Sequence, residues 1–261
     1  MTVPALQALV VAACLAAVAW RLRTLTISGA LAATLVGSAT LCAGGWWGGA
    51  LLLTFFVGST LVSKLCPDPA ADRGEAKGGR RDAGQVLANG GAPALGALLA
   101  MATGGAGLWP LATGLAAAAA DTWATALGAT SPAPPRHLLT GAPLVAGTSG
   151  GVTWRGTTGG ILGATSVALV AWRASGSAML AVAAVIIGCS GMLLDSLLGA
   201  TVQGRFHRQA CGIETERRRH RCGAWSTPTG GIAWLSNDIV NALATAAATG
   251  AGLVVECFLT R

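Results

Sequence analysis

Apolar runs recur along almost the whole chain of 261 residues, and most charged residues fall between them. A helix needs roughly 20 apolar residues to cross a bilayer of roughly 30 Å. The pattern predicts an all-α fold, a polytopic membrane helix bundle of about 7–8 transmembrane helices in a single domain spanning residues 1–261. The eight runs lie near residues 4–20, 27–43, 46–63, 86–104, 108–128, 157–172, 177–201 and 239–259.

The composition favours a membrane bundle over a soluble domain. Only 10% of the residues are charged, against about a quarter in soluble domains. The 38 glycines suit membrane helices, which pack closely through small residues. No basic segment precedes the first apolar run and no clear cleavage site follows it, so we expect a retained helix rather than a signal peptide.

The basic residues predict an orientation. If the N-terminus lies outside and the chain crosses eight times, all of the 17 Lys and Arg residues except Arg173 and Arg261 fall on the inner side. The positive-inside rule favours this arrangement in a bacterial-type plasma membrane, with short outer loops and an active face on the cytoplasmic side. The longer inner loops are then 66–84, 129–156 and 202–236.

These basic loops also restrict the partners. They can meet anionic lipid headgroups, so membrane lipids are expected partners. Nucleic acid is not, because no soluble basic domain is present to bind it. A homodimer is a further expected arrangement that the sequence leaves undecided.

Polar stretches adjoin the inner ends of the predicted helices. Because residues four apart share a helix face, Arg81, Gln85 and Asn89 are expected on one face, and Asp121 and Thr125 on another. The stretches are GGRRDAGQVLANG (78–90), DTWATALG (121–128), GTSGGVTWRGTTGG (147–160), GMLLDSLLGA (191–200) and NDIVNALAT (237–245).

Two of these stretches place an acid beside hydrocarbon. A carboxylate there costs a few kcal/mol and is tolerated when it faces a cavity and has a partner. Carboxylate oxygens suit Mg²⁺, which takes one or two protein carboxylates together with substrate phosphates. We therefore predict a magnesium site formed by Asp121, Asp195 and Asp238.

Arginines and glycine amides beside these acids suit phosphate oxygens. We expect Arg81 and Arg155 to act with Asp121 and Asp195 as the catalytic set. Ten further residues of the five stretches are expected to bind the substrate or its phosphates. They are Arg80, Gln85, Asn89, Thr125, Thr148, Ser149, Gly150, Gly151, Asn237 and Asn241.

Each assignment has a structural alternative. Asp121 or Asp195 could pair with an arginine and hold helices together. Gly159 and Gly160 are better explained as notches for helix packing. The sequence SGG at 149–151 is a weak phosphate-loop signal, because no GK[ST] follows it.

Two more pairs have structural alternatives of their own. Gln85 and Asn89 could bond across helices. Asn237 and Asp238 could cap the last helix, a common role for Asn and Asp.

A cysteine-containing segment, CGIETERRRHRC (211–222), offers three candidate zinc ligands. They are Cys211, His220 and Cys222. Structural zinc normally takes four ligands, often in C-x-x-C pairs, and no such pair is present. We expect a solvated basic loop here.

Taken together and in order, the five polar stretches resemble a family of integral membrane proteins. It includes the eukaryotic transmembrane-protein-nineteen group and the plant phytyl-phosphate kinase of vitamin E synthesis. The likeness covers roughly residues 1 to 260. A more distant likeness is to membrane phosphatidate cytidylyltransferases, which bind metal and nucleotide at acidic helix ends.

The resemblance implies a membrane phosphotransferase. Such an enzyme would transfer a phosphoryl group from a nucleoside triphosphate, with CTP favoured, to an isoprenoid (phytyl-type) monophosphate, using Mg²⁺. One alternative is a CTP-dependent cytidylyltransferase acting on a lipid phosphate. Another is a lipid transporter or binding protein without chemistry, because polar residues in membrane helices also mark substrate paths.

Overall fold

A computed structural model describes residues 3–67, 79–208, 213–215 and 225–259, and it is mostly helical. Its helices correspond to the predicted apolar runs, so the predicted helix bundle is confirmed. The described helices are α1 (Ala5–Arg21), α2 (Ile27–Leu65), α3 (Ala83–Ala102), α4 (Leu108–Ala129), α5 (Trp154–Ser175), α6 (Ala178–Thr201) and α7 (Asn237–Leu259).

Helix α2 is two helical arms joined by a sharp kink. Gly45 has φ 60° and ψ −155°, a conformation that is essentially restricted to glycine. A Cβ added to Gly48 would lie 2.6 Å from the carbonyl oxygen of Thr40, so the second arm folds back against the first. The two apolar runs predicted at 27–43 and 46–63 are therefore two arms of one element.

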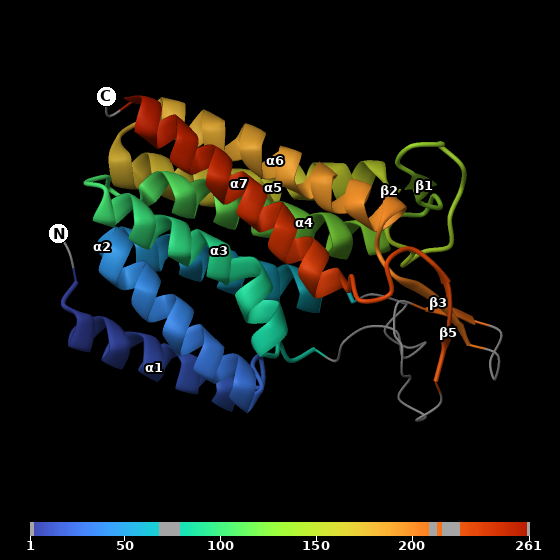
Figure 1. Cartoon of the computed structure of the whole chain (residues 1–261), viewed down its shortest axis with the longest axis horizontal. Helices are drawn as coiled ribbons and strands as arrows, with labels where there is room; N and C mark the ends of the chain where they lie inside the picture. The colour runs from blue at the N-terminus through green and yellow to red at the C-terminus, as the bar shows by residue number, and fades with distance from the viewer. Residues whose placement is uncertain (1–2, 68–78, 209–212, 216–224, 260–261) are drawn as a thin grey trace.

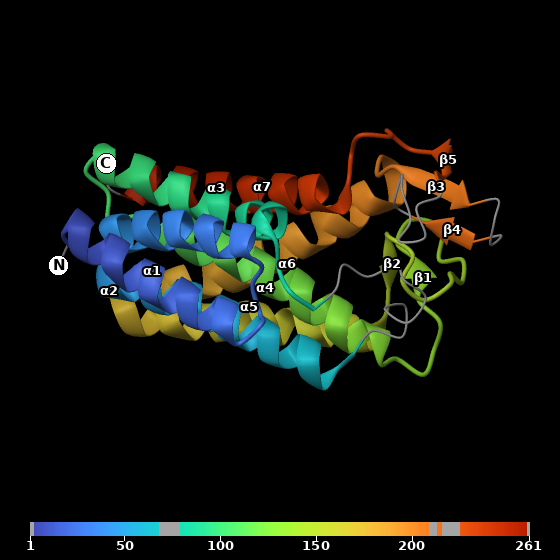
Figure 2. The same ribbon diagram turned by 90° about the horizontal axis from the view of Figure 1, so that it is seen from below.

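The chain runs back and forth between two ends of the bundle (Figures 1 and 2). Both termini lie at one end, which we call the turn end, together with the kink of α2 and the α3–α4 and α5–α6 turns. The described parts of 66–84, 129–156 and 202–236 lie at the opposite end, which we call the cavity end. The described parts of the three long connections thus share one end of the bundle with the α1–α2 turn.

Helix α4 is the central helix. It contacts α2, α3, α5, α6 and α7, and every residue from Pro110 to Ala120 is buried. Glycines on its neighbours allow this close approach. A Cβ added to Gly163 of α5 would lie 2.6 Å from the carbonyl oxygen of Ala119, and one on Gly188 of α6 would lie 2.8 Å from the Cβ of Ala116.

Two small sheets lie at the cavity end and were not predicted. The strands β1 (Arg136–His137) and β2 (Gly151–Val152) pair in antiparallel fashion. A second sheet has the order β4-β3-β5, from β4 (Ile213–Thr215), β3 (Arg205–Arg208) and β5 (Thr227–Gly230). Strands this short, in segments rich in Gly, Pro and Thr, show no apolar alternation long enough to identify them in the sequence.

Four helices are long and apolar enough to cross a bilayer on length and composition alone: α2, α3, α6 and α7. Helix α1 is shorter, with 17 residues. Helix α4 is surrounded by the others, and alanine rather than larger apolar residues fills its buried half because its neighbours pack so closely.

Candidate functional site

A polar cavity of about 870 Å³ opens at the cavity end of the bundle. The ends of α2, α3, α4, α5, α6 and α7 and the segments 131–135 and 146–153 form its wall. The volume lies within the usual range for a small-molecule site, roughly 300–1,000 Å³. Almost every residue that the sequence marked as a site candidate lines it.

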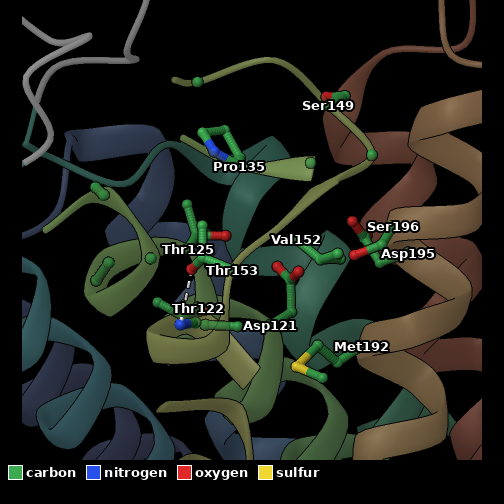
Figure 3. Close-up of a pocket in the computed structure, with 18 of the residues that line it drawn as sticks. Asp121, Thr122, Thr125, Pro135, Ser149, Val152, Thr153, Met192, Asp195 and Ser196 are labelled. Carbon is green, nitrogen blue, oxygen red and sulfur yellow. Dashed lines mark hydrogen bonds between the residues drawn. The ribbon is translucent and has the colours of Figure 1, made fainter. Parts of the chain in front are cut away.

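Asp121 and Asp195 reach this cavity from different helices. Asp121 comes from α4 and Asp195 from α6, and Figure 3 shows both carboxylates directed into the same part of the cavity. Asp121 makes no hydrogen bond or ion pair with any residue in the described part of the chain. The structural alternative for Asp121, an ion pair with a described arginine, is therefore not observed.

Arg81 is the positively charged side chain that lines the cavity within the described residues. Its guanidinium lies 5.4 Å from the ring centroids of both Phe55 and Phe56, within the range of cation–π contact. Burial lowers the pKa of Arg81 to about 10, so the side chain is still protonated at neutral pH. No hydrogen bond from the guanidinium to another described residue is present, which leaves its N–H groups available to an anion.

The backbone holds Arg81 firmly in place. Its N–H donates to the carbonyl of Thr24 at 2.9 Å, and its carbonyl accepts from the N–H of Thr26 at 3.0 Å. A Cβ on Gly29 would strike that same carbonyl, so α2 approaches the backbone of Arg81 closely. The turn between α1 and α2 thus fixes the position of the Arg81 backbone at the site.

The polar lining residues of α3 also make structural hydrogen bonds. Asp82 and Gln85 form a reciprocal capping box at the start of the helix. Asn89 donates to the carbonyl of Gln85 at 2.9 Å. These bonds of Gln85 and Asn89 lie within α3 and its N-cap, and both side chains still line the cavity.

Helix α7 contributes Asn237, Asp238 and Asn241 to the wall. The Oδ1 atom of Asn241 is buried and has no hydrogen-bond partner among the described residues. A buried oxygen without a donor is the kind of atom that a hard cation can satisfy. Asn241 therefore joins Asp121 and Asp195 as an oxygen donor that fits Mg²⁺.

The glycine-rich stretch also lies at the cavity. Thr148, Ser149, Gly150 and Gly151 line the cavity, and so does Thr125. Within the described residues, no three His, Cys, Asp or Glu side chains lie close enough to hold a metal by themselves. A cation here would therefore need the amide oxygen of α7 and phosphate oxygens of a ligand.

Arg80 and Arg155 do not line the cavity. Arg80 donates from Nε and Nη2 to the carbonyl of Leu25, at 3.1 and 2.8 Å, and so reinforces the α1–α2 turn. Arg155 is exposed and donates to the carbonyl of Thr130 at 2.7 Å. Spacing alone did not separate these two from Arg81, because neighbouring residues point in different directions from the backbone.

Gly159 and Gly160 are packing notches, as expected. A Cβ on Gly159 would lie 2.8 Å from the carbonyl oxygen of Trp123 in α4. One on Gly160 would strike the sulfur of Met192 in α6. These two glycines allow α4, α5 and α6 to meet beneath the cavity.

Several polar cavity residues were not predicted, and three of them lie close to the acids. Thr122, Thr153 and Ser196 all line the wall and appear beside the acids in Figure 3. All three lie inside polar stretches that the sequence analysis identified, so membership of those stretches was the available signal. The candidate zinc ligands Cys211, His220 and Cys222, in the segment expected to be a solvated basic loop, lie outside the described residues.

Comparison with known proteins agrees with the fold and the motifs. The model of an integral membrane protein family, DUF92, matches residues 10–249. The chain belongs to the DUF92 family of integral membrane proteins. This confirms that the bundle is a membrane protein and supports the family resemblance drawn from the five polar stretches.

A curated relative supports the same family assignment. This DUF92 chain is 30% identical to Protein PGR of Arabidopsis thaliana over 225 residues, covering 75% of the chain and 78% of that protein. No solved structure matches the chain.

Proposed function

We propose that this DUF92 protein is a Mg²⁺-dependent membrane phosphotransferase that uses a nucleoside triphosphate, with CTP favoured, to phosphorylate an isoprenoid monophosphate. The observation that carries the proposal is the meeting, in one cavity, of two carboxylates from separate helices with an arginine whose guanidinium makes no hydrogen bond to a described residue. Phosphoryl transfer depends mainly on positioning and charge neutralisation, which such a set of groups can supply.

The chemistry needs no covalent nucleophile from the protein. An oxygen of the acceptor phosphate attacks the γ-phosphorus, and the bond from that phosphorus to the β–γ bridging oxygen breaks. The products are the isoprenoid diphosphate and a nucleoside diphosphate. The acceptor phosphate is already ionised, so it needs little help from a general base.

Each polar element of the wall has a proposed role. Asp121, Asp195 and Asn241 hold Mg²⁺, which when bound neutralises charge on the phosphate oxygens. Arg81 binds a phosphate through guanidinium N–H groups that make no hydrogen bond to the described residues. The backbone of Ser149, Gly150 and Gly151 lies against the nucleotide phosphates, as glycine-rich turns do in other phosphate sites.

The cavity end is proposed to face the cytoplasm. Arg21, Arg23, Lys64 and Arg136 lie there, whereas Arg173 lies at the turn end. In a variant whose only cysteine is Cys257, at the exposed turn end, a membrane-impermeant maleimide should label intact cells. Labelling only after the membrane is permeabilised would show that the cavity end faces outward instead.

The test of the reaction uses purified protein, Mg²⁺, phytyl or geranylgeranyl monophosphate, and CTP labelled at either the α or the γ position. Transfer of the γ label to lipid supports the proposal. Transfer of the α label with release of pyrophosphate would indicate a cytidylyltransferase. Lipid movement in proteoliposomes that needs no nucleotide would indicate a transporter.

A further inference from the structure

The glycine-rich stretch at 147–151 rests directly on the end of α6. Gly150 has φ +79°, a left-handed conformation that favours glycine. A Cβ added to it would lie 2.5 Å from the Cβ of Ala200 and 2.6 Å from its Cα. A Cβ on Gly199 would lie 3.2 Å from the backbone nitrogen of Gly150. The two backbones therefore meet without a side chain between them.

One side chain of this helix end bonds to the same stretch. Gln203 is only 2% exposed, and its Nε2 donates to the hydroxyl oxygen of Ser149 at 3.0 Å. Asp195, Gly199 and Gln203 follow each other at intervals of four, so they lie along one side of α6 and its end. The acid and the residue that holds the glycine-rich stretch thus share one rigid element.

The backbone around Gln203 also holds the entrance to α7. The N–H of Ile232 donates to the carbonyl of Val202 at 2.8 Å, and the N–H of Gly204 donates to the carbonyl of Leu235 at 3.0 Å. Gly231, with φ +68°, lies so close to the carbonyl of Gln203 that a Cβ would not fit. This segment leads directly into the cavity-lining start of α7.

We propose that Gln203 is a positioning residue of the site, which fixes the stretch 147–151 relative to Asp195 through its bond to Ser149. Gln203 does not line the cavity, so it acts through Ser149 and not by contact with a ligand. An apolar side chain of similar size would fill the same buried space but leave the Ser149 hydroxyl without this donor. The role in phosphate binding rests on the proposed function, whereas the positioning itself does not.

The test measures the stretch directly, by hydrogen–deuterium exchange of the peptide covering residues 147–151 in detergent-solubilised protein. The variants are Gln203→Met, Ser149→Ala and the double variant. We expect amide exchange about two- to tenfold faster in each single variant, the range for loss of one hydrogen bond, and no further increase in the double variant. Ser177→Ala, which removes a helix cap at the turn end, is the matched control and should leave this peptide unchanged.

Steady-state kinetics give a second readout. Gln203→Met should raise the KM for the nucleotide while kcat stays within about twofold, because the bond positions a binding element and not the reacting groups. Unchanged exchange in both single variants overturns the inference. If Gln203→Met does not fold, Ser149→Ala tests the same bond from the other side. Faster exchange without any phosphoryl transfer upholds the positioning and rejects the proposed function.

Discussion

The two halves of α4 lie in different environments, although they belong to one continuous helix. From Pro110 to Ala120 every residue is buried against other helices, and small residues allow the helices to approach. From Asp121 onward the helix turns toward the polar cavity. The first half specifies packing and the second half carries the proposed chemistry, so changes in the two halves should separate stability from activity.

The largest expected effect is at the boundary between the halves. Asp121→Asn should lower the rate of γ-phosphoryl transfer by about 10²–10³-fold, the loss expected when a preorganised charge at the reacting centre is removed. Thermal stability should not fall, because the change removes a carboxylate that has no partner among the described residues. Enzyme assay and calorimetry of the same preparation check both parts.

Glu256→Gln is the matched control for that change. Glu256 is buried at the turn end, where its carboxylate accepts from the N–H of Ala106 at 3.0 Å. The same carboxylate-to-amide change there should leave the transfer rate of folded protein unaltered. Equal activity losses in the two variants would mean that the distinction between the two ends of the bundle is wrong.

The next largest effect is expected at Arg81, the arginine that lines the same cavity as the polar half of α4. Arg81→Met should weaken binding of pyrophosphate about 10- to 100-fold, because hydrogen bonds to charged groups contribute about 1.5–3 kcal/mol. Isothermal titration calorimetry measures this affinity. Arg155→Met, at an exposed arginine outside the cavity, should change it by less than about twofold. An equal loss in both variants would assign the effect to general surface charge.

In the buried half, Ala116→Leu should affect stability and not chemistry. A Cβ on Gly188 would already lie 2.8 Å from the Cβ of Ala116, so the added carbons have no space. Overpacking of this kind costs about 1–3 kcal/mol, which thermal unfolding in detergent can detect. Ala247→Leu, on an exposed face of α7, is the control and should unfold like the parent protein.

The smallest effect is expected at the anchor of Arg81. Arg80→Met removes two bonds to the carbonyl of Leu25 and should lower the free energy of unfolding by about 1 kcal/mol. Pyrophosphate affinity should fall by no more than about fivefold, because the backbone bonds of Arg81 to Thr24 and Thr26 persist. A loss as large as that in Arg81→Met would show instead that Arg80 binds the anion itself.

Much of the bundle could be predicted because hydrocarbon imposes a simple rule on sequence. Apolar runs located every helix, and the gap between the runs 27–43 and 46–63 falls at the kink in α2. The candidate site residues could also be proposed from the sequence. Polar side chains at intervals of four share one face of a helix, and inside a membrane bundle such faces are expected to line a common cavity.

The rest depends on contacts that spacing does not encode. Arg80 and Arg81 are neighbours in sequence, but the side chain of Arg80 bonds to the carbonyl of Leu25 whereas Arg81 lines the cavity. Gln203 contacts Ser149 across 54 residues of sequence, so its role appears only once the chain is folded. The short strands depend on the same long-range approach.

Binding of Mn²⁺ as a substitute for Mg²⁺, followed by electron paramagnetic resonance, tests the central claim most directly. The unmodified protein in the presence of nucleotide should bind Mn²⁺, and either Asp121→Asn or Asp195→Asn alone should abolish or greatly weaken that binding. Such a result would place both carboxylates at one cation. Binding that is unchanged in both variants would contradict the account.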